Sequence, residues 1–291
     1  MKKNLIYVVA IDDPNAKIPA NDYFQYSRPT WEHYCDRHDI DLIVQREHQF
    51  DDTIKPIWNK ELISEIGKGY EKIGIVDSDT MVRWDAPNIF DQFSEDEFCG
   101  VNDLCDLNWL FKSIGDRQHF FPYVKMDLSN YLNAGVLFFG NRYLFIFERL
   151  LHFYIDYKDE IDAIKGGGRE QTLLNFFLQQ SHNMLFSPCG CGIGVYNEPL
   201  HWDDMSGKIH CSACGAEILW HQKVNIKKLS PAWNLLSIHR KNMFTHNWQL
   251  DSDKTPYFMK YAYVWHFTGF PIEDRVNVMR QTWEMTKHLY T

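Results

Sequence analysis

Two aspartates, one residue apart, follow a short apolar run in the first third of the sequence. The run Ile73–Val76 is mostly β-branched and predicts a buried strand, and Asp77 and Asp79 come directly after it. In an open α/β sheet ligands bind outside the carboxyl ends of the strands, so both carboxylates are placed where chemistry is usually done. Carboxylate oxygens at this spacing suit Mg²⁺ or Mn²⁺, often shared with substrate phosphates. Taken alone, the pair is equally consistent with a strand followed by a polar turn.

Three later segments carry polar side chains that suit the same site. The segment Asn133–Val136 leads into an apolar strand, Glu170 and Gln171 open a predicted helix, and His266 lies between two aromatic residues. Each has an ordinary structural explanation: a tight turn, a polar first turn of a helix and a hydrogen-bonded core histidine. Only their joint order along the chain favours a functional interpretation.

The composition fits a globular α/β protein. With 291 residues, 45% of them hydrophobic, the chain can form one large domain or two small ones around a sizeable core. The net charge of −9 disfavours non-specific binding to nucleic acid or to anionic membranes, but not binding of a nucleotide whose charge a metal carries. No apolar run reaches the roughly 18 residues of a membrane span. The N-terminal apolar run ends at Asp12 and Asp13 without a small-residue cleavage site, which predicts a strand, not a signal peptide, and a cytoplasmic protein.

The elements that position these residues alternate in the first part of the chain. Strands are predicted over residues 4–11, 40–46 and 73–76. A helix capped by Ser27, with Pro29 in its first turn, separates the first two strands. A second helix over residues 58–66 precedes the third strand. This alternation predicts parallel strands with helices on the faces of the sheet.

Longer elements and one irregular region are predicted after the two aspartates. A short helix begins near residues 86–90, and residues 94–130 are expected to be irregular. A strand over 131–141 precedes a helix over 143–157. Gly166–Gly168 is a flexible hinge before the helix that opens with Glu170. Strand-like segments at 224–229 and 263–269 and a final helix over 273–288 complete the chain.

In order and spacing, the four polar segments resemble the GT-A glycosyltransferases of the glycogenin and lipopolysaccharide galactosyltransferase group. The resemblance covers nearly the whole chain apart from residues 186–222. It implies one α/β, Rossmann-like GT-A domain over 1–291 with a mixed sheet, a nucleotide-binding half over about 1–140 and an acceptor half over about 141–291. It also implies a metal-dependent enzyme, usually using Mn²⁺, that moves a hexose from a nucleotide sugar, usually a UDP-sugar, to a glycan or other hydroxyl acceptor with retention.

The resemblance also assigns roles to individual residues. Asp77 and Asp79 match the metal-binding D-x-D, and His266 matches the third metal ligand. Glu170 and Gln171 match an acidic–glutamine pair beside the reacting carbon. The remaining positions belong to donor binding: Asp12 at the nucleobase and ribose, Lys60 in the helix before the D-x-D strand, Asn133 and Gly135 at the sugar, and also Ser78 and Gly269.

One position departs from the family pattern. The late His-x-x-Gly of the family often continues to a Lys-Pro pair whose lysine lies on the pyrophosphate. Here Gly269 is followed by Phe270 and Pro271, and Arg275 is the cation that could replace that lysine. A divalent cation across both phosphates stabilises the leaving diphosphate as a Lewis acid. A carboxylate or amide beside the sugar steadies an oxocarbenium-like centre.

A cysteine-rich insertion over residues 186–222 lies outside the resemblance. Cys189 and Cys191 form one short pair, and Cys211 and Cys214 form another. Four thiolates at such spacing suit a closed, structural Zn²⁺ site, although four unrelated thiols remain an alternative. A histidine could replace one thiolate; the candidates are His182, His201, His210 and His221. The three scattered cysteines, Cys35, Cys99 and Cys105, are predicted to be buried thiols.

Three other functions remain open. A phosphohydrolase of the haloacid dehalogenase type also places D-x-D after a strand, but near the chain's start and with Thr or Val where this chain has Met81. An inactive glycan- or nucleotide-binding module is a second alternative, which the intact metal-ligand types disfavour. Nucleic-acid binding through the cysteines is a third, which the acidic net charge disfavours. A local basic segment between Lys223 and Lys241 could instead serve an anionic acceptor.

Overall fold

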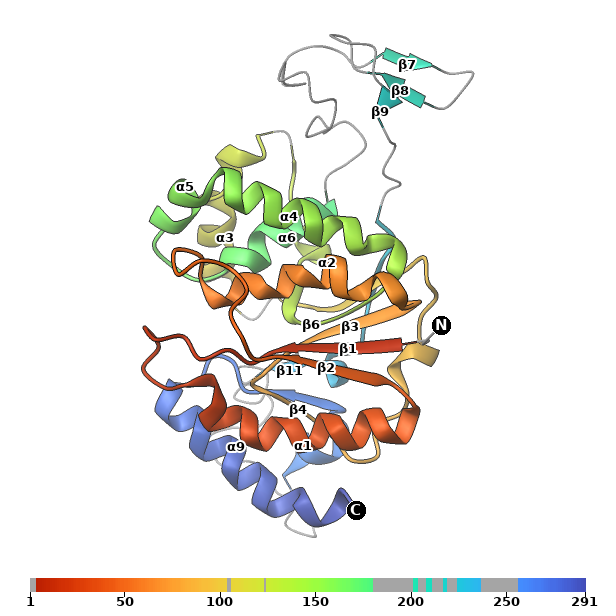
Figure 1. Cartoon of the computed structure of the whole chain (residues 1–291), viewed down its shortest axis with the longest axis vertical. Coiled ribbons are helices and arrows are strands. Elements are labelled where there is room, and N and C mark those ends of the chain that lie inside the picture. Colours follow the sequence, from red (N-terminus) through yellow and green to blue (C-terminus); the bar gives the residue numbers. More distant parts are fainter. Residues whose placement is uncertain are drawn as a thin grey trace.

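A six-stranded mixed sheet forms the centre of the computed structural model (Figure 1). The structure describes residues 4–103, 106–122, 124–179, 201–203, 208–210, 217–218, 224–236 and 256–291. The strand order is β10-β5-β6-β3-β1-β2. The bounds are β1 Asn4–Val9, β2 Asp41–Gln45, β3 Lys72–Asp77, β5 Phe98–Asn102, β6 Leu132–Gly140 and β10 Ile226–Lys228.

Strand direction changes at β6. Strands β1, β2 and β3 are parallel, as predicted, whereas β6 runs antiparallel to both β3 and β5. In the β3–β6 register Val76 lies opposite Val136, so the beginning of β6 is at the same edge of the sheet as the carboxyl end of β3. The topology therefore brings Asn133 and Gly135 to the edge that carries Asp77.

Both faces of the sheet are buried, because successive side chains of a strand point to opposite faces. Leu5 and Tyr7 of β1 join one core, and Ile6 and Val8 join the other. All nine residues of β6 are buried. A strand covered on both sides has no polar face, which explains why β3 and β6 could be predicted as continuous apolar runs.

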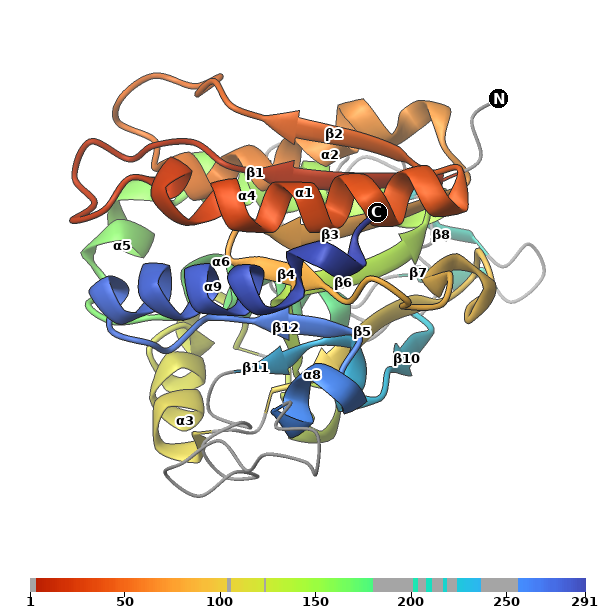
Figure 2. The ribbon, with the colours of Figure 1, turned by 90° about the horizontal axis from the view of Figure 1, so that it is seen from below.

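Helices cover the two faces (Figures 1 and 2). Helices α1 (Ala20–His38) and α9 (Ile272–Thr286) pack together on one side. On the other side lie α2 (Ile63–Ile66), α4 (Leu144–Asp156) and α6 (Arg169–Gln179), with α3 (Leu107–Gly115) and α5 (Lys158–Ala163) nearby. Trp58 stacks on Tyr154 of α4 with ring centroids 3.7 Å apart. Within the described residues, every helix is too short or too polar to cross a bilayer.

A smaller sheet joins the end of the chain to the two aspartates. Strand β12 (Val264–His266) pairs antiparallel with β4 (Thr80–Val82) and parallel with β11 (Leu235–Leu236). His266 lies opposite Thr80 in this register. Helix α8 (Tyr257–Tyr261) supports the sheet through a hydrogen bond from the indole of Trp265 to the carbonyl of Phe258.

Several predicted element boundaries were wrong. Helix α1 begins at Ala20, ahead of Ser27, so that Pro29 lies inside it, because its first turns bury Ala20 and Phe24. The helix predicted over 58–66 is a 3₁₀ helix, η1 (Pro56–Leu62), followed by the single α-helical turn α2. The region 94–130, predicted to be irregular, contains β5 and α3. Strand β5 has a regular conformation because it pairs with β6 and β10, which are far away in sequence.

The cysteine prediction falls mostly outside the described residues. Cys189, Cys191, Cys211 and Cys214 lie there, as do His182, His221 and Cys105. Within the insertion, β7 (His201–Asp203), β8 (Lys208–His210) and β9 (Glu217–Ile218) form an antiparallel sheet. Cys35 and Cys99 are buried free thiols, as predicted.

Candidate active site

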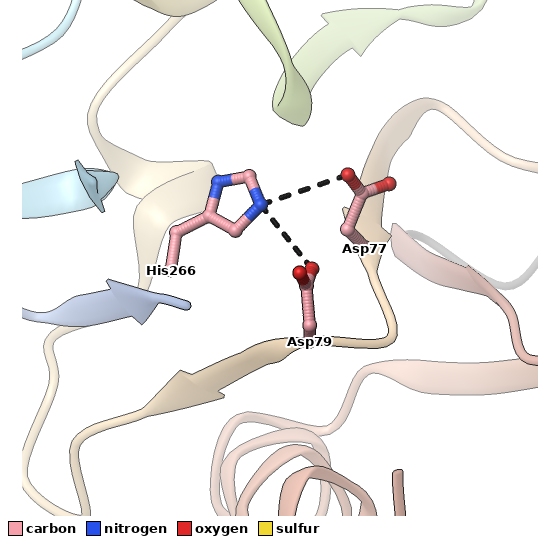
Figure 3. Close-up of side chains that lie close together, drawn as sticks. All are labelled: Asp77, Asp79 and His266. Atoms are coloured by element: carbon pink, nitrogen blue, oxygen red, sulfur yellow. Dashed lines mark ion pairs between the residues drawn. The ribbon is translucent and has the colours of Figure 1, made fainter. Parts of the chain in front are cut away.

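Asp77, Asp79 and His266 converge at the edge of the two sheets (Figure 3). Asp77 ends β3, Asp79 lies in the turn before β4, and His266 ends β12. The Nε2 atom of His266 is 3.2 Å from Oδ1 of Asp79 and 3.7 Å from Oδ2 of Asp77. One ligand atom from each residue lies within 4.8 Å of the other two. The structure thus brings together the three residues that the sequence predicted as metal ligands.

This donor set fits a divalent cation. His266 is 2% exposed, and its Nε2 atom has no hydrogen-bond partner in the described part of the chain. Burial of an unsatisfied ring nitrogen is costly unless another group, such as a cation, binds it. Gly135 leaves room beside the three ligands: a Cβ atom there would lie 2.2 Å from Cε1 of His266 and 2.7 Å from Oδ2 of Asp77. Two carboxylates and one neutral imidazole suit Mn²⁺ or Mg²⁺.

Two basic side chains hold the carboxylates in place. Nη1 of Arg275 is 2.9 Å from Oδ2 of Asp79, and Nζ of Lys60 is 2.5 Å from Oδ1 of Asp77. Burial alone would raise the pKa of Asp79, but nearby positive charge, chiefly that of Arg275, outweighs it and holds that pKa well below its usual range. Burial would lower the pKa of Lys60, but Asp77 and Glu170 raise it above its ordinary value. Asp79 is therefore ionised and Lys60 charged at neutral pH.

Glu170 and Gln171 lie in the first turn of α6, as predicted. The preceding glycines Gly166 and Gly168 have φ values of +131° and +76°, a region that favours glycine. Oε1 of Glu170 accepts a hydrogen bond from Nζ of Lys60 at 2.9 Å. Burial raises the pKa of Glu170, and Lys60 opposes that rise. Lys60 thus links the carboxylate of α6 to the metal-site carboxylate Asp77.

Gln171 has a fixed orientation. Its Oε1 atom accepts hydrogen bonds from the backbone N–H of Ala134 at 3.0 Å and from Nδ2 of Asn133 at 3.1 Å. Its Nε2 atom donates to Oδ2 of Asp103 at 3.1 Å. Because a backbone N–H can only donate, the oxygen of Gln171 must face Ala134. The amide is held rigidly against the beginning of β6.

The sequence did not single out two residues of this network, Asp103 and Asn234. Asp103 comes directly after β5 and accepts from Asn133 and Gln171. Asn234 comes directly before β11 and contacts both Asn133 and His266. A polar residue at a strand end is the signal that could have found Asp103, but β5 itself was not predicted. Asn234 carries no such signal, since β11 has only two residues.

A cavity of about 600 Å³ opens beside the network. Ligand pockets commonly have volumes of this order. Its walls bring together polar residues of the site, the glycine loop before α6 and one aromatic ring. The lining includes Asp103, Asn133, Glu170, Gln171, Gly166–Gly168, Trp109 and Gly269. Glu170 and Gln171 therefore lie at the wall of a space large enough for a small organic ligand.

The other predicted donor residues have different surroundings. Asp12 is exposed at the carboxyl end of β1, where it accepts hydrogen bonds from the backbone and side chain of Asn21 at the start of α1. Ser78 is buried between the two aspartates. Burial raises the pKa of Tyr23 to about 12, and a hydrogen bond with Ser78 opposes that rise. Gly269 has a φ of +76° and lines the cavity. The role of Asp12 and Ser78 in nucleotide binding stays a prediction.

Solved structures of glycosyltransferases have the same overall fold. A glycosyltransferase involved in glycosylation of the major capsid of PBCV-1 is 12% identical, with a TM-score of 0.50, over 95% of this chain and 98% of that one. The bifunctional glycosyltransferase WbbM is 13% identical, with a TM-score of 0.51, over 99% of this chain and 51% of WbbM. The galactosyltransferase LgtC is 13% identical over 95% of each chain, with a TM-score of 0.45. No protein-family model and no curated protein sequence matches this chain.

The first two similarities establish the class of fold. This chain has the mixed α/β fold of glycosyltransferases, which confirms the predicted fold and the resemblance at that level. The chain spans about half the length of WbbM and nearly all of the PBCV-1 enzyme.

Proposed function

We propose that this protein is a metal-dependent glycosyltransferase that moves a hexose from a UDP-sugar to a hydroxyl of a glycan or other acceptor, with retention. One observation carries the proposal: a buried imidazole and two carboxylates each place one ligand atom within 4.8 Å of the other two, next to the cavity that Glu170 and Gln171 line. The glycosyltransferase fold of the chain supports it. A nucleotide diphosphate is negatively charged. Although the protein as a whole is acidic, a cation in the site and the nearby basic side chain of Arg275 would both attract such a ligand.

Different residues of the chain would act on the diphosphate end and on the sugar end of the donor. Asp77, Asp79 and His266 would hold Mn²⁺ or Mg²⁺. When bound, such an ion supplies Lewis-acid stabilisation of the leaving diphosphate. Arg275, at the start of α9, lies beside Asp79 and adds a second positive charge for the diphosphate oxygens. Lys60 orients Asp77 and balances part of the charge of Glu170.

Glu170 and Gln171 act on the sugar in this proposal. As the bond from the anomeric carbon to the diphosphate breaks, positive charge develops on the sugar ring. The buried carboxylate of Glu170 would stabilise that charge without having to reorganise, and the rigid amide of Gln171 would form the cavity wall beside the sugar. The acceptor hydroxyl then bonds to the anomeric carbon and gives its proton to an oxygen of the departing diphosphate, which has taken the electron pair of the broken bond. The cavity beside Trp109 offers room for the sugar, and aromatic rings commonly pack against sugar faces.

A screen of nucleotide sugars for Mn²⁺-dependent hydrolysis tests the proposal. The expected result is release of UDP from at least one UDP-sugar, lost on chelation and in Asp79→Ala. A phosphohydrolase would instead release inorganic phosphate from phosphate monoesters. An inactive binding module would bind UDP without turnover. Either of these two results would reject the glycosyltransferase proposal.

We also propose a structural Zn²⁺ in the insertion, on the sequence spacing of Cys189, Cys191, Cys211 and Cys214 alone. Metal analysis of protein purified without added zinc should find about one Zn²⁺ per chain, as expected for a closed four-ligand site. The double variant Cys211→Ser/Cys214→Ser should lose it. Wild-type protein without zinc would refute this site and leave the glycosyltransferase proposal untouched.

A further inference from the structure

We propose that Asn234 is a positioning residue that fixes the tautomer of His266 and so keeps its Nε2 atom available to a cation. This inference rests on the metal site of the proposed function. It concerns a side chain that does not itself touch the cation position. A chain of hydrogen bonds that begins at the backbone of β6 leads through Asn133 and Asn234 to His266.

The first link fixes the orientation of Asn133. The backbone N–H of Gly135 donates to Oδ1 of Asn133 at 3.0 Å. On the other side, Nδ2 of Asn133 donates to Oδ2 of Asp103 at 3.0 Å. A backbone N–H can only donate and an ionised carboxylate can only accept, so the amide of Asn133 has one possible orientation.

The second link transfers this constraint to Asn234. Nδ2 of Asn234 donates to Oδ1 of Asn133 at 2.9 Å. Its oxygen must therefore be the atom that lies 2.9 Å from Nδ1 of His266. An amide oxygen cannot donate, so Nδ1 of His266 carries a hydrogen. In the neutral ring the lone pair is then on Nε2, the atom that faces Asp77 and Asp79.

Burial makes the constraint effective. Asn133 is 6% exposed, Asn234 is 0% exposed and His266 is 2% exposed, so bulk water cannot replace a lost partner in the chain. Without the oxygen of Asn234, the ring would gain most by placing its hydrogen on Nε2 and donating to Asp79, 3.2 Å away. That tautomer would block the cation position with an N–H group. Asn234 thus determines whether Nε2 of His266 offers a lone pair to the cation or carries an N–H group that excludes it.

Three variants separate this role from a general effect on folding. Asn234→Leu has a similar size but no acceptor for the Nδ1 hydrogen. Asn234→Asp keeps an acceptor facing His266, loses the donor to Asn133 and adds a negative charge. Asn141→Leu is the control: its amide bonds the carbonyls of Gly67 and Tyr70 at the opposite end of β6. Circular dichroism and thermal unfolding of each variant report whether it folds.

Two measurements test the inference. Electron paramagnetic resonance of Mn²⁺ should show affinity about 10- to 100-fold weaker in Asn234→Leu, the usual effect of losing a residue that orients a metal ligand. Asn234→Asp and Asn141→Leu should stay within a few-fold of wild type by the same reasoning. Nitrogen-15 NMR of the metal-free protein at mildly alkaline pH, where an ordinary imidazole is neutral, should place the hydrogen on Nδ1 in wild type and on Nε2 in Asn234→Leu.

The tautomer measurement needs no metal, so it decides the inference independently of the proposed function. Wild-type protein with its hydrogen on Nε2 would overturn the role of Asn234, even if Asn234→Leu failed to fold. A folded Asn234→Leu that keeps the Nδ1 hydrogen and wild-type Mn²⁺ affinity would overturn it as well. Wild-type protein that binds no Mn²⁺ but has the Nδ1 hydrogen would refute the metal site and leave the tautomer assignment standing.

Discussion

Nζ of Lys60 lies 2.9 Å from Oε1 of Glu170, although 110 positions separate the two residues in the chain. The same Nζ is 2.5 Å from Oδ1 of Asp77. One buried cation therefore balances a carboxylate of the proposed metal site and a carboxylate on the sugar side. Removing one partner of a buried ion pair leaves an uncompensated charge, which costs more than the pair itself contributes.

Lys60→Met should lower the free energy of unfolding by about 3 kcal/mol, the size typical of a broken buried pair. Adding Glu170→Gln should restore part of that loss, because one of the two uncompensated carboxylates becomes neutral. Lys68→Met is the matched control, since Lys68 pairs with Glu65 on the surface and both side chains are 63% exposed. Urea unfolding measures all four proteins. A Lys60→Met protein as stable as the Lys68→Met protein would contradict this account.

Gly135→Ala should weaken metal binding while the fold survives. The added methyl group would overlap the ring of His266 and the carboxylate of Asp77, so at least two ligands must move. We expect Mn²⁺ affinity to fall about tenfold or more, as when ligand orientation is lost. Gly69→Ala serves as the control, because a Cβ atom there meets nothing within 4 Å. Equal Mn²⁺ titrations of the two variants would show that Gly135 does not serve the site.

Glu170→Gln and Gln171→Ala should lower the rate of transfer far more than the affinity for UDP. Both side chains line the cavity, whereas the cation ligands lie at the neighbouring edge of the sheets. Loss of one electrostatic contact to a developing charge lowers kcat on the order of a hundredfold. Calorimetric UDP titrations and initial transfer rates separate the two effects. A large drop in UDP affinity with an unchanged rate would place these residues at the nucleotide instead.

The buried side chain of Glu61 should make the free energy of unfolding depend on pH. It is 1% exposed, and neither of its oxygens has a hydrogen-bond partner in the described part of the chain. Burial, and secondarily Glu170, raises the pKa of Glu61 well above its ordinary value. A raised pKa means that the folded state binds the proton more tightly. The contribution of Glu61 to the free energy of unfolding is therefore fully present below about pH 4.3. It is lost as the pH rises through the folded-state pKa of Glu61.

Glu61→Gln removes that dependence, because the amide stays neutral. Wild type and variant should have similar unfolding free energies near pH 4, and the variant should be the more stable one at neutral pH. Each unit by which the pKa is raised corresponds to about 1.4 kcal/mol of this difference. Glu65→Gln, at an exposed position, is the control and should not be more stable than wild type at neutral pH. A Glu61→Gln protein that is less stable than wild type at neutral pH would refute the assignment.

The sequence predicted the parts of the fold that are buried on both sides. Strands β1, β3 and β6 appear as apolar runs because the cores on both faces exclude polar residues. Strand β5 and helix α3 were missed because their regularity depends on distant partners: β5 pairs with β6, and α3 packs near α6. Local composition does not contain that information. The start of α1 was misplaced for the same reason, since Phe24 is helical where it fills the core beside Trp31.

Residues of the candidate site could be predicted from the sequence where the proposed chemistry requires a particular type of side chain. Two carboxylates after a strand, a late histidine and the pair at the start of α6 could be chosen by type and order alone. The antiparallel direction of β6, which brings Gly135 beside Asp77, could not be predicted from its apolar run. Asp103 and Asn234 were missed because an amide or carboxylate that orients another side chain differs in no local way from an ordinary turn residue.

Calorimetric titration of UDP with and without Mn²⁺ tests the central claim most directly, in wild type and in Asp79→Ala. Asp79 forms an ion pair with Arg275 and lies beside His266. The Asp79→Ala substitution therefore removes one ligand from the proposed cation site. We predict that Mn²⁺ strengthens UDP binding to wild type at least tenfold, the order expected when an ion bridges carboxylates and phosphates. Asp79→Ala should lose that increase and keep its fold. Equal UDP affinity of wild type with and without Mn²⁺ would contradict the claim that Asp77, Asp79 and His266 form a metal–nucleotide site.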